Sequence, residues 1–117
     1  MANPNLLSLT TITGNTAVQA ITTTATAIIT NNAASGKVIK VSALYVSNVD
    51  GTTFGEVNVD LYRSTTAYHI AKTVVVPADA TLDVISKAIY LMEGDSLRLT
   101  ANANTTLQAV CSYEEIS

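Results

Sequence analysis

The amino-acid sequence predicts an all-β protein: a two-sheet antiparallel β-sandwich, jelly-roll-like, with little or no helix. Runs in which apolar and polar residues alternate recur between turn residues roughly every 8–12 residues, which is typical of sandwiches and barrels. No window keeps apolar residues at helical spacing with polar residues between them. The chain has 117 residues, of which 48% are hydrophobic and 13% charged, so it is long enough for one domain with its own core.

Residues 1–36 are rich in Thr and Ala and contain no charged side chain. Two candidate strands lie there: Leu6–Thr13, expected to end at Gly14-Asn15, and Val18–Thr30, which is one long strand or two short ones. Threonine is β-branched and suits a pleated surface. The segment therefore either supplies the first strands of the same domain or forms an arm that lies on a neighbouring subunit.

Residues 37–117 form the sandwich core and hold all six basic and all nine acidic side chains. Val38–Asn48 is the first strand of this part, and its alternation predicts Val41 and Leu44 on opposite faces. Asp50-Gly51 then predicts a hairpin, because both residues tolerate positive φ angles.

Glu56–Arg63 shows the cleanest alternation of the chain. Val57 and Val59 are expected to face the core, while Asp60 and Tyr62 face outward. Short turns separate the remaining candidate strands, which are Ala67–Val76, Thr81–Ile85, Ala88–Met92, Ser96–Ala101 and Thr105–Glu114.

The charge balance and hydropathy limit the partners that we expect. A net charge of −3 and an isoelectric point near 4.8 argue against nucleic acid or an anionic membrane as the main partner. Threonines interrupt every apolar run, so no transmembrane helix is expected. No Lys or Arg precedes Lys37, so the positive region of a signal peptide is absent and we expect a chain made in, and soluble in, a cytoplasm.

The sequence offers little catalytic chemistry. Cys111 is the one cysteine and lies in an apolar run, which favours a small buried hydrophobic residue over a nucleophile. His69 is the one histidine, and none of the usual zinc, redox, phosphate-binding or acyl-transfer motifs is present. We therefore expect no catalytic residue, cofactor or metal. Capping of turns is the interpretation favoured over calcium binding for the carboxylates Asp79, Asp83, Glu93 and Asp95.

Subunit contacts are one role that the sequence suggests for some of its apolar and aromatic residues. All five tyrosines lie in predicted strands, and tyrosine gives either an interface or the half-buried edge of a sheet a large amphipathic contact area. Tyr62 and Tyr68 are expected close together across the turn between their strands. The candidate interface residues are Leu6, Leu7, Leu9, Tyr62, Tyr68 and Tyr113.

The stretch Lys37–Ile116 resembles a small β-sandwich domain found in virion structural proteins of tailed phages, particularly cyanophages. Each matching piece is short, and the order and spacing of the pieces carry the resemblance. They are Gly36–Val41, Leu44–Gly51, Val57–Leu61, His69–Lys72, Val76–Leu82, Leu91–Leu99 and Val110–Tyr113.

The resemblance implies a non-enzymatic structural protein of a bacteriophage virion, assembled in the host cytoplasm. The most favoured role is a decoration or cement protein that self-associates and contacts the major capsid protein; neck, tail and fibre components are the alternatives. A glycan-binding adhesin is a further alternative, and a cupin-type enzyme is disfavoured because one histidine cannot supply a His-rich metal site. The candidate glycan-binding residues are Asp95, Asn102, Asn104 and Tyr113.

Overall fold

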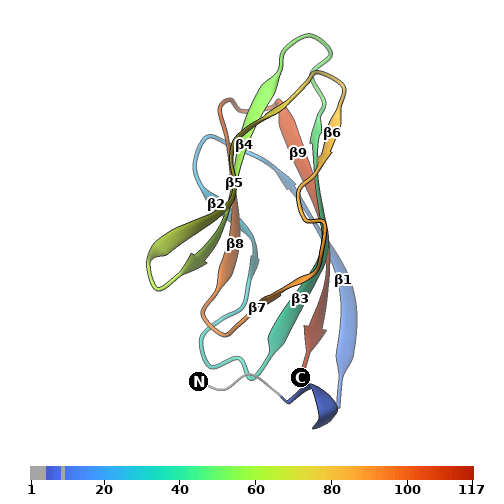
Figure 1. Ribbon diagram of the computed structural model, residues 1–117, viewed down its shortest axis with the longest axis vertical. Helices are drawn as coiled ribbons and strands as arrows, with labels where there is room; N and C mark the ends of the chain where they lie inside the picture. The colour runs from blue at the N-terminus through green and yellow to red at the C-terminus, as the bar shows by residue number, and fades with distance from the viewer. Residues whose placement is uncertain (1–4, 9) are drawn as a thin grey trace.

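A computed structural model describes residues 5–8 and 10–117 and contains two antiparallel β-sheets packed against each other (Figure 1). The molecule is elongated, with extents of 49 × 26 × 19 Å. Sheet A has the order β1 (Ile12–Ala20), β9 (Leu107–Ile116), β3 (Val38–Asn48) and β6 (Thr81–Asp83), with β7 (Ile89–Leu91) also paired to β3. Sheet B has the order β2 (Thr26–Thr30), β8 (Ser96–Ala101), β4 (Gly55–Arg63) and β5 (Thr66–Val76).

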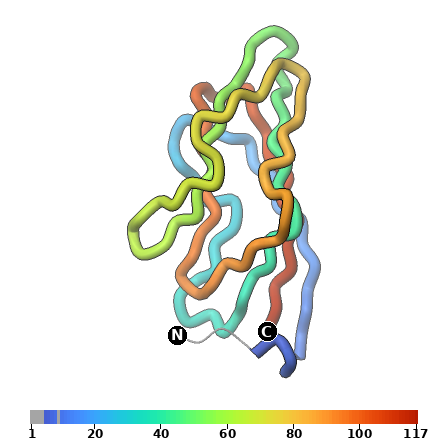
Figure 2. Tube along the Cα trace, in the orientation of Figure 1, coloured from blue at the N-terminus to red at the C-terminus, as the bar shows by residue number. Residues whose placement is uncertain are grey.

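The strand order explains how one chain builds both sheets. The strand pairs are nested in the sequence. β4 pairs with β5 at the middle of the chain, β3 pairs with β6 and β7, β2 pairs with β8, and β1 pairs with β9 near the two ends. Successive pairs alternate between sheet B and sheet A, so the chain is one long antiparallel hairpin that has been rolled up, as the continuous trace in Figure 2 shows. This jelly-roll-like sandwich confirms the fold class predicted from the sequence.

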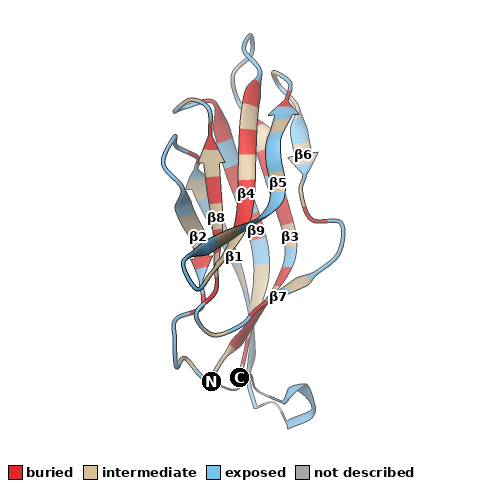
Figure 3. Cartoon of the chain, turned by 60° about the vertical axis from the view of Figure 1, so that its left-hand side comes forward, coloured by how far each residue is buried: buried red, intermediate tan, exposed pale blue. Residues whose placement is uncertain are grey.

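The core lies between the sheets and consists of aliphatic side chains from the inward faces of the strands. Val57 and Val59 of β4 and Leu97 and Leu99 of β8 are fully buried, which confirms the alternation predicted for β4. Figure 3 shows buried residues alternating along β4 and β8, whereas β5 is mostly exposed. Cys111 of β9 is also fully buried, and burial raises the pKa of its thiol to about 11, so it serves as a core residue.

The N-terminal part of the chain corrects the predicted boundaries. Leu6–Ser8 forms the 3-10 turn η1 instead of a strand, and the Oδ1 atom of Asn5 accepts a hydrogen bond from the Leu7 N–H at 2.9 Å. The first strand, β1, runs straight through Gly14-Asn15, where the sequence predicted an end. The reason is its partner, because all nine residues of β1 pair with β9 in one unbroken register.

A bulge in β3 corrects the faces predicted for that strand. The register of β3 against β9 shifts between Val41 and Ala43, with Ser42 as the extra residue. The shift reverses the alternation, so Val41 and Leu44 both point into the core and both are fully buried. In the sequence, the bulge corresponds to a spacing of three between these two buried residues, where regular alternation would give a spacing of two.

The predicted hairpin at Asp50-Gly51 is wrong, because β3 lies in sheet A and β4 in sheet B. Asp50 instead stabilises the loop between β3 and β4 through its side chain. Its Oδ1 atom accepts hydrogen bonds from the Thr52 N–H at 2.9 Å and the Thr53 N–H at 3.2 Å. The hydrogen bonds from Thr52 and Thr53 lower the pKa of the Asp50 carboxyl below its usual value, so the loop is held by an ionised side chain.

Candidate assembly surface

The outer face of sheet A carries a row of exposed apolar side chains across three neighbouring strands. Val18 of β1 lies opposite Val110 of β9, which in turn lies opposite Tyr45 of β3. The chain neighbours of Tyr45 and Val110 are buried in the core, and Ala17 beside Val18 packs against it, so these three side chains point away from the core. Val18 is 75% exposed, Val110 44% and Tyr45 43%. We call Val18, Val110 and Tyr45 the apolar row.

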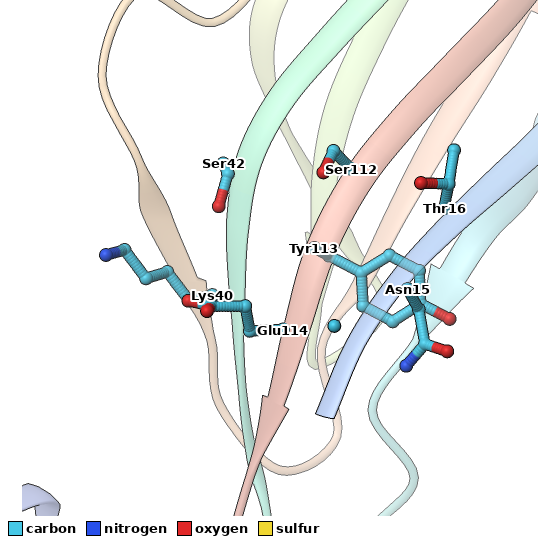
Figure 4. Close-up of a pocket in the computed structure, with 8 residues that line it drawn as sticks. Asn15, Thr16, Lys40, Ser42, Ser112, Tyr113 and Glu114 are labelled. Atoms are coloured by element: carbon cyan, nitrogen blue, oxygen red, sulfur yellow. The ribbon is translucent and has the colours of Figure 1, made fainter. Parts of the chain in front are cut away.

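Two depressions flank the apolar row along β1 and β9. One, of about 290 Å³, is lined by residues 18–20 and 108–110 and continues the apolar surface. The other, of about 580 Å³, is polar and includes the side chains of Thr16, Ser42 and Ser112 (Figure 4). Gly14 lines it without a side chain, and a Cβ atom at that position would meet nothing within 4 Å.

Charges lie at the margins of this face. Lys40 of β3 is paired in register with Glu114 of β9 and, on its other side, with Tyr90 of β7. Asp83 lies opposite Tyr45 on β6, at the far edge of the sheet. β1 itself has no charged residue. The centre of the face is therefore uncharged, a composition typical of the core of protein–protein interfaces.

The edge strand β1 leaves half of its backbone polar groups facing solvent. Thr11 and Ser117 exchange two backbone hydrogen bonds of 2.9 Å, and Ile21 donates to the Leu107 carbonyl oxygen at 2.9 Å. In an antiparallel ladder such pairs alternate, so the odd-numbered residues of β1 bond to β9. The even-numbered residues, Ile12, Gly14, Thr16, Val18 and Ala20, therefore turn their N–H and C=O groups toward the open edge.

Ion pairs cover the centre and one end of the outer face of sheet B. Asp60, predicted to face outward, does lie on this face but is only 2% exposed, because Arg98 covers it. The Arg98 Nε atom donates to Asp60 Oδ1 at 2.9 Å, and the Arg98 guanidinium lies 3.9 Å from the centre of the Tyr62 ring. This packing adds a cation–π contact to the ion pair.

A second ion pair joins the end of β4 to the turn before β8. Arg63 binds both oxygens of Asp95, at 2.7 and 2.6 Å, and the Met92 N–H donates to Asp95 Oδ2 at 2.8 Å. Burial alone would raise the pKa of Asp95, but the hydrogen bonds from Arg63 and Met92 and the charge of Arg63 outweigh it and lower the pKa. Asp95 thus caps its turn, the role favoured by the sequence.

The structure separates the interface residues predicted from the sequence. Leu6 and Leu7 lie in η1 and are exposed, Leu7 almost fully, while Leu9 lies outside the described residues. Tyr62 and Tyr68 lie on β4 and β5, where Tyr62 packs under Arg98 and Tyr68 is exposed. Tyr113 of β9 packs partly against the core.

The four candidate glycan-binding residues do not come together. Asp95 and Asn102 lie at opposite ends of β8, which corresponds to roughly 20 Å along the strand. The Oδ1 atoms of Asn102 and Asn104 accept hydrogen bonds from the Glu56 and Thr23 N–H groups. Both side chains therefore serve to hold the loop between β8 and β9.

Among residues 5–8 and 10–117, no three His, Cys, Asp or Glu side chains gather in a way that could hold a metal ion. Within the same residues, no helix is long and apolar enough to span a membrane. His69 is exposed on β5, opposite Asp60.

Sequence reasoning missed Val18 and Val110, the two most exposed members of the apolar row. The sequence pattern predicts Val110 only as part of an apolar run with Cys111, and Val18 only as the start of a strand. Local pattern gives no signal for Val110, because Ala109 and Cys111 on either side of it are themselves apolar. Only the pairing of the first strand with the last brings the two valines together.

The fold and this surface define an antiparallel sandwich with one open face whose centre is uncharged. The chain is similar to a structure described as "Bacillus endospore appendages form a novel family of disulfide-linked pili", with 14% identity, a TM-score of 0.55, and coverage of 98% of this chain and 95% of the other. At that identity the likeness concerns the fold. No family model and no curated protein matches the sequence.

Two further structures are described as a pentameric capsid protein isolated from metagenomic phage sequences. They match with TM-scores of 0.45 and 0.46 at 19% and 17% identity. Each match covers 86% of this chain, but the chain spans only 59% and 66% of the length of those two proteins.

Proposed function

We propose that this protein is a non-enzymatic structural subunit of a tailed-phage virion, a decoration or cement protein that contacts its neighbours through the outer face of sheet A. The observation that carries the proposal is the apolar row, which leaves Val18, Val110 and Tyr45 in water at the uncharged centre of a sheet. The resemblance of residues 37–116 to virion sandwich domains supports the phage setting.

The physical argument is the free energy of burying this face. Each exposed square ångström of apolar surface contributes about 25 cal/mol when it leaves water. Single exposed apolar residues are common, but a row that crosses three strands is a typical feature of an interaction site. Tyrosine is enriched and charge is depleted at the centre of such sites, as they are here.

The spore-appendage likeness adds support at the level of the fold. That protein is described as forming pili, so a sandwich of this shape is able to serve as the subunit of an assembly. Its pili are described as disulfide-linked, whereas Cys111 of this chain is fully buried with a raised thiol pKa. Association of this chain through Cys111 would require unfolding, so the proposal relies on noncovalent contacts.

The test is the protein composition of virions from the phage that encodes this sequence. The wild-type chain is expected in purified particles. Val110→Glu is expected to be depleted from them, because it places a charge at the centre of the proposed contact. The matched control is Val75→Glu, which changes a valine of similar exposure on β5 of sheet B. Absence of the wild-type chain from particles would overturn the proposed function.

Immunogold labelling of the same particles then tests the role within the virion. Label spread over the head supports decoration. Label confined to the neck, tail or fibres would keep the virion role and replace the decoration role. Equal depletion of Val75→Glu and Val110→Glu would show that a general loss of folding, and not the outer face of sheet A, explains the result.

A further inference from the structure

The open edge of β1 differs from the other sheet edges of the molecule. β5 is interrupted by two shifts in register against β4, and Thr73 within it has a φ of 51°. β2 has five residues and a shift between Ala27 and Ile29, and the Ala27 carbonyl oxygen is already bonded to the Gln19 side chain at 3.1 Å. β6 and β7 have three residues each. These are the usual devices that prevent edge-to-edge pairing.

β1 uses none of these devices. It has nine residues in unbroken register, no proline and no charged side chain. The hydrogen bonds found among residues 5–8 and 10–117 leave the open-edge N–H and C=O groups of its even-numbered residues unpaired. A strand with these properties is a template for another extended strand.

The side-chain sizes along β1 are complementary to those of a second β1 strand that runs antiparallel to it. If two copies run antiparallel with Thr16 opposite Thr16, Val18 lies opposite Gly14, and Ile12 lies opposite Ala20. Each larger side chain then faces a smaller one, and the central threonines form a favourable cross-strand pair. The residues that meet are those whose backbone groups face the open edge, so five pairs would exchange about ten hydrogen bonds.

We propose that two copies of this protein associate through β1, antiparallel and about a two-fold axis beside Thr16, and join their A sheets into one continuous sheet. A second copy is the occupant that the observations favour, because β1 brings no charge to the contact and matches its own reversed sequence in size. The apolar rows of the two copies then lie on one shared face. This inference goes beyond the proposed function, since it concerns the purified chain without any particle.

Disulfide trapping tests both the contact and its register. Thr16→Cys is expected to form a covalent dimer under mild oxidation, because the two Cα atoms would lie about 5.5 Å apart, within the range that a disulfide spans. Val18→Cys alone is expected to remain monomeric in reducing-agent-free gels, because its copies would lie about 13 Å apart. Mixing Val18→Cys with Gly14→Cys is expected to restore the covalent dimer.

Matched controls keep the result interpretable. Cys111 is fully buried and present in every variant, so the wild-type chain measures the background. Thr26→Cys places an exposed cysteine on the edge strand β2 and is expected to stay monomeric. Equal trapping of Thr26→Cys and Thr16→Cys, or no trapping of Thr16→Cys, would overturn the proposal.

A noncovalent measurement provides a second test. The wild-type chain is expected to sediment as a dimer, and Thr16→Lys as a monomer, because two lysines would face each other at the axis. Thr26→Lys is expected to remain dimeric. Both variants should fold, since both threonines are exposed. Thr26→Lys should unfold like the wild type, whereas Thr16→Lys should unfold like the wild type diluted to the monomer, because association adds stability to the native state. A monomeric wild-type chain would overturn this inference and leave the virion-composition test of the proposed function unaffected.

Discussion

The two outer faces of the sandwich differ in which side chains lie at their centres and in how far those side chains are exposed. On sheet B, Asp60 and Arg98 lie directly opposite each other, and their ion pair closes the surface over Tyr62. On sheet A, the corresponding central positions hold Val110 and Tyr45, which remain exposed. The centre of sheet B is therefore covered from within the chain, and Val75 is left exposed only on its edge strand β5. The centre of sheet A leaves apolar area that only another molecule would cover.

This difference predicts which mutations change the stability of the monomer and which change its association. A residue on the outer face of sheet B should contribute to the stability of the monomer, because its partners are in the same chain. A residue on the outer face of sheet A should contribute little to folding and more to association.

Asp60→Ala is expected to destabilise the protein by about 3 kcal/mol, because it leaves the Arg98 guanidinium without its carboxylate in a mostly buried position. Chemical denaturation measures the free energy of unfolding. Asp83→Ala is the control, since Asp83 is an exposed aspartate on the outer side of β6 in sheet A, and it should cost less than about 0.5 kcal/mol. Similar costs for the two variants would contradict the proposed difference between the faces.

The prediction for Asp60 shows how far sequence reasoning reaches. Alternation placed Asp60 on the outward side of β4, which is correct, but it could not show that the side chain is buried. Arg98 lies 38 residues away in the sequence, and the pairing of β4 with β8 brings it opposite Asp60. Strand identity and inward faces follow from local pattern, whereas burial on an outer face depends on partners that are distant in the sequence.

The same limit explains the errors at β1 and β3. Gly14-Asn15 is a turn signal in isolation, but the register with β9 holds the chain extended through it. At β3, strict alternation carried Val41 and Leu44 to opposite faces, and the bulge at Ser42 returned both to the core. The candidate surface cannot be predicted from local pattern, because Val18 and Val110 become neighbours only when the first and last strands pair.

Asp95 provides a pH test of the ion pairs at the ends of sheet B. Because its pKa is lowered in the folded state, its contribution to stability is fully present above its unfolded value near 3.8. That contribution is lost as the pH falls through this value toward the lower folded pKa. Unfolding measured across the acidic range should therefore show a weaker pH dependence for Asp95→Asn than for the wild type. Parallel pH profiles for the two proteins would show that Asp95 does not titrate with folding.

The smallest expected effect on folding belongs to the apolar row. Val110→Thr removes no core contact, because the side chain points away from the interior and threonine keeps the β-branched shape that suits a strand. The free energy of unfolding of the monomer is expected to change by less than about 0.5 kcal/mol. Val59→Thr, the control, places a hydroxyl in the core without a partner and should cost about 1–3 kcal/mol. If Val110→Thr destabilised the isolated chain as much as Val59→Thr, the apolar row would belong to the folding of the monomer, and sheet A would have no face reserved for a partner.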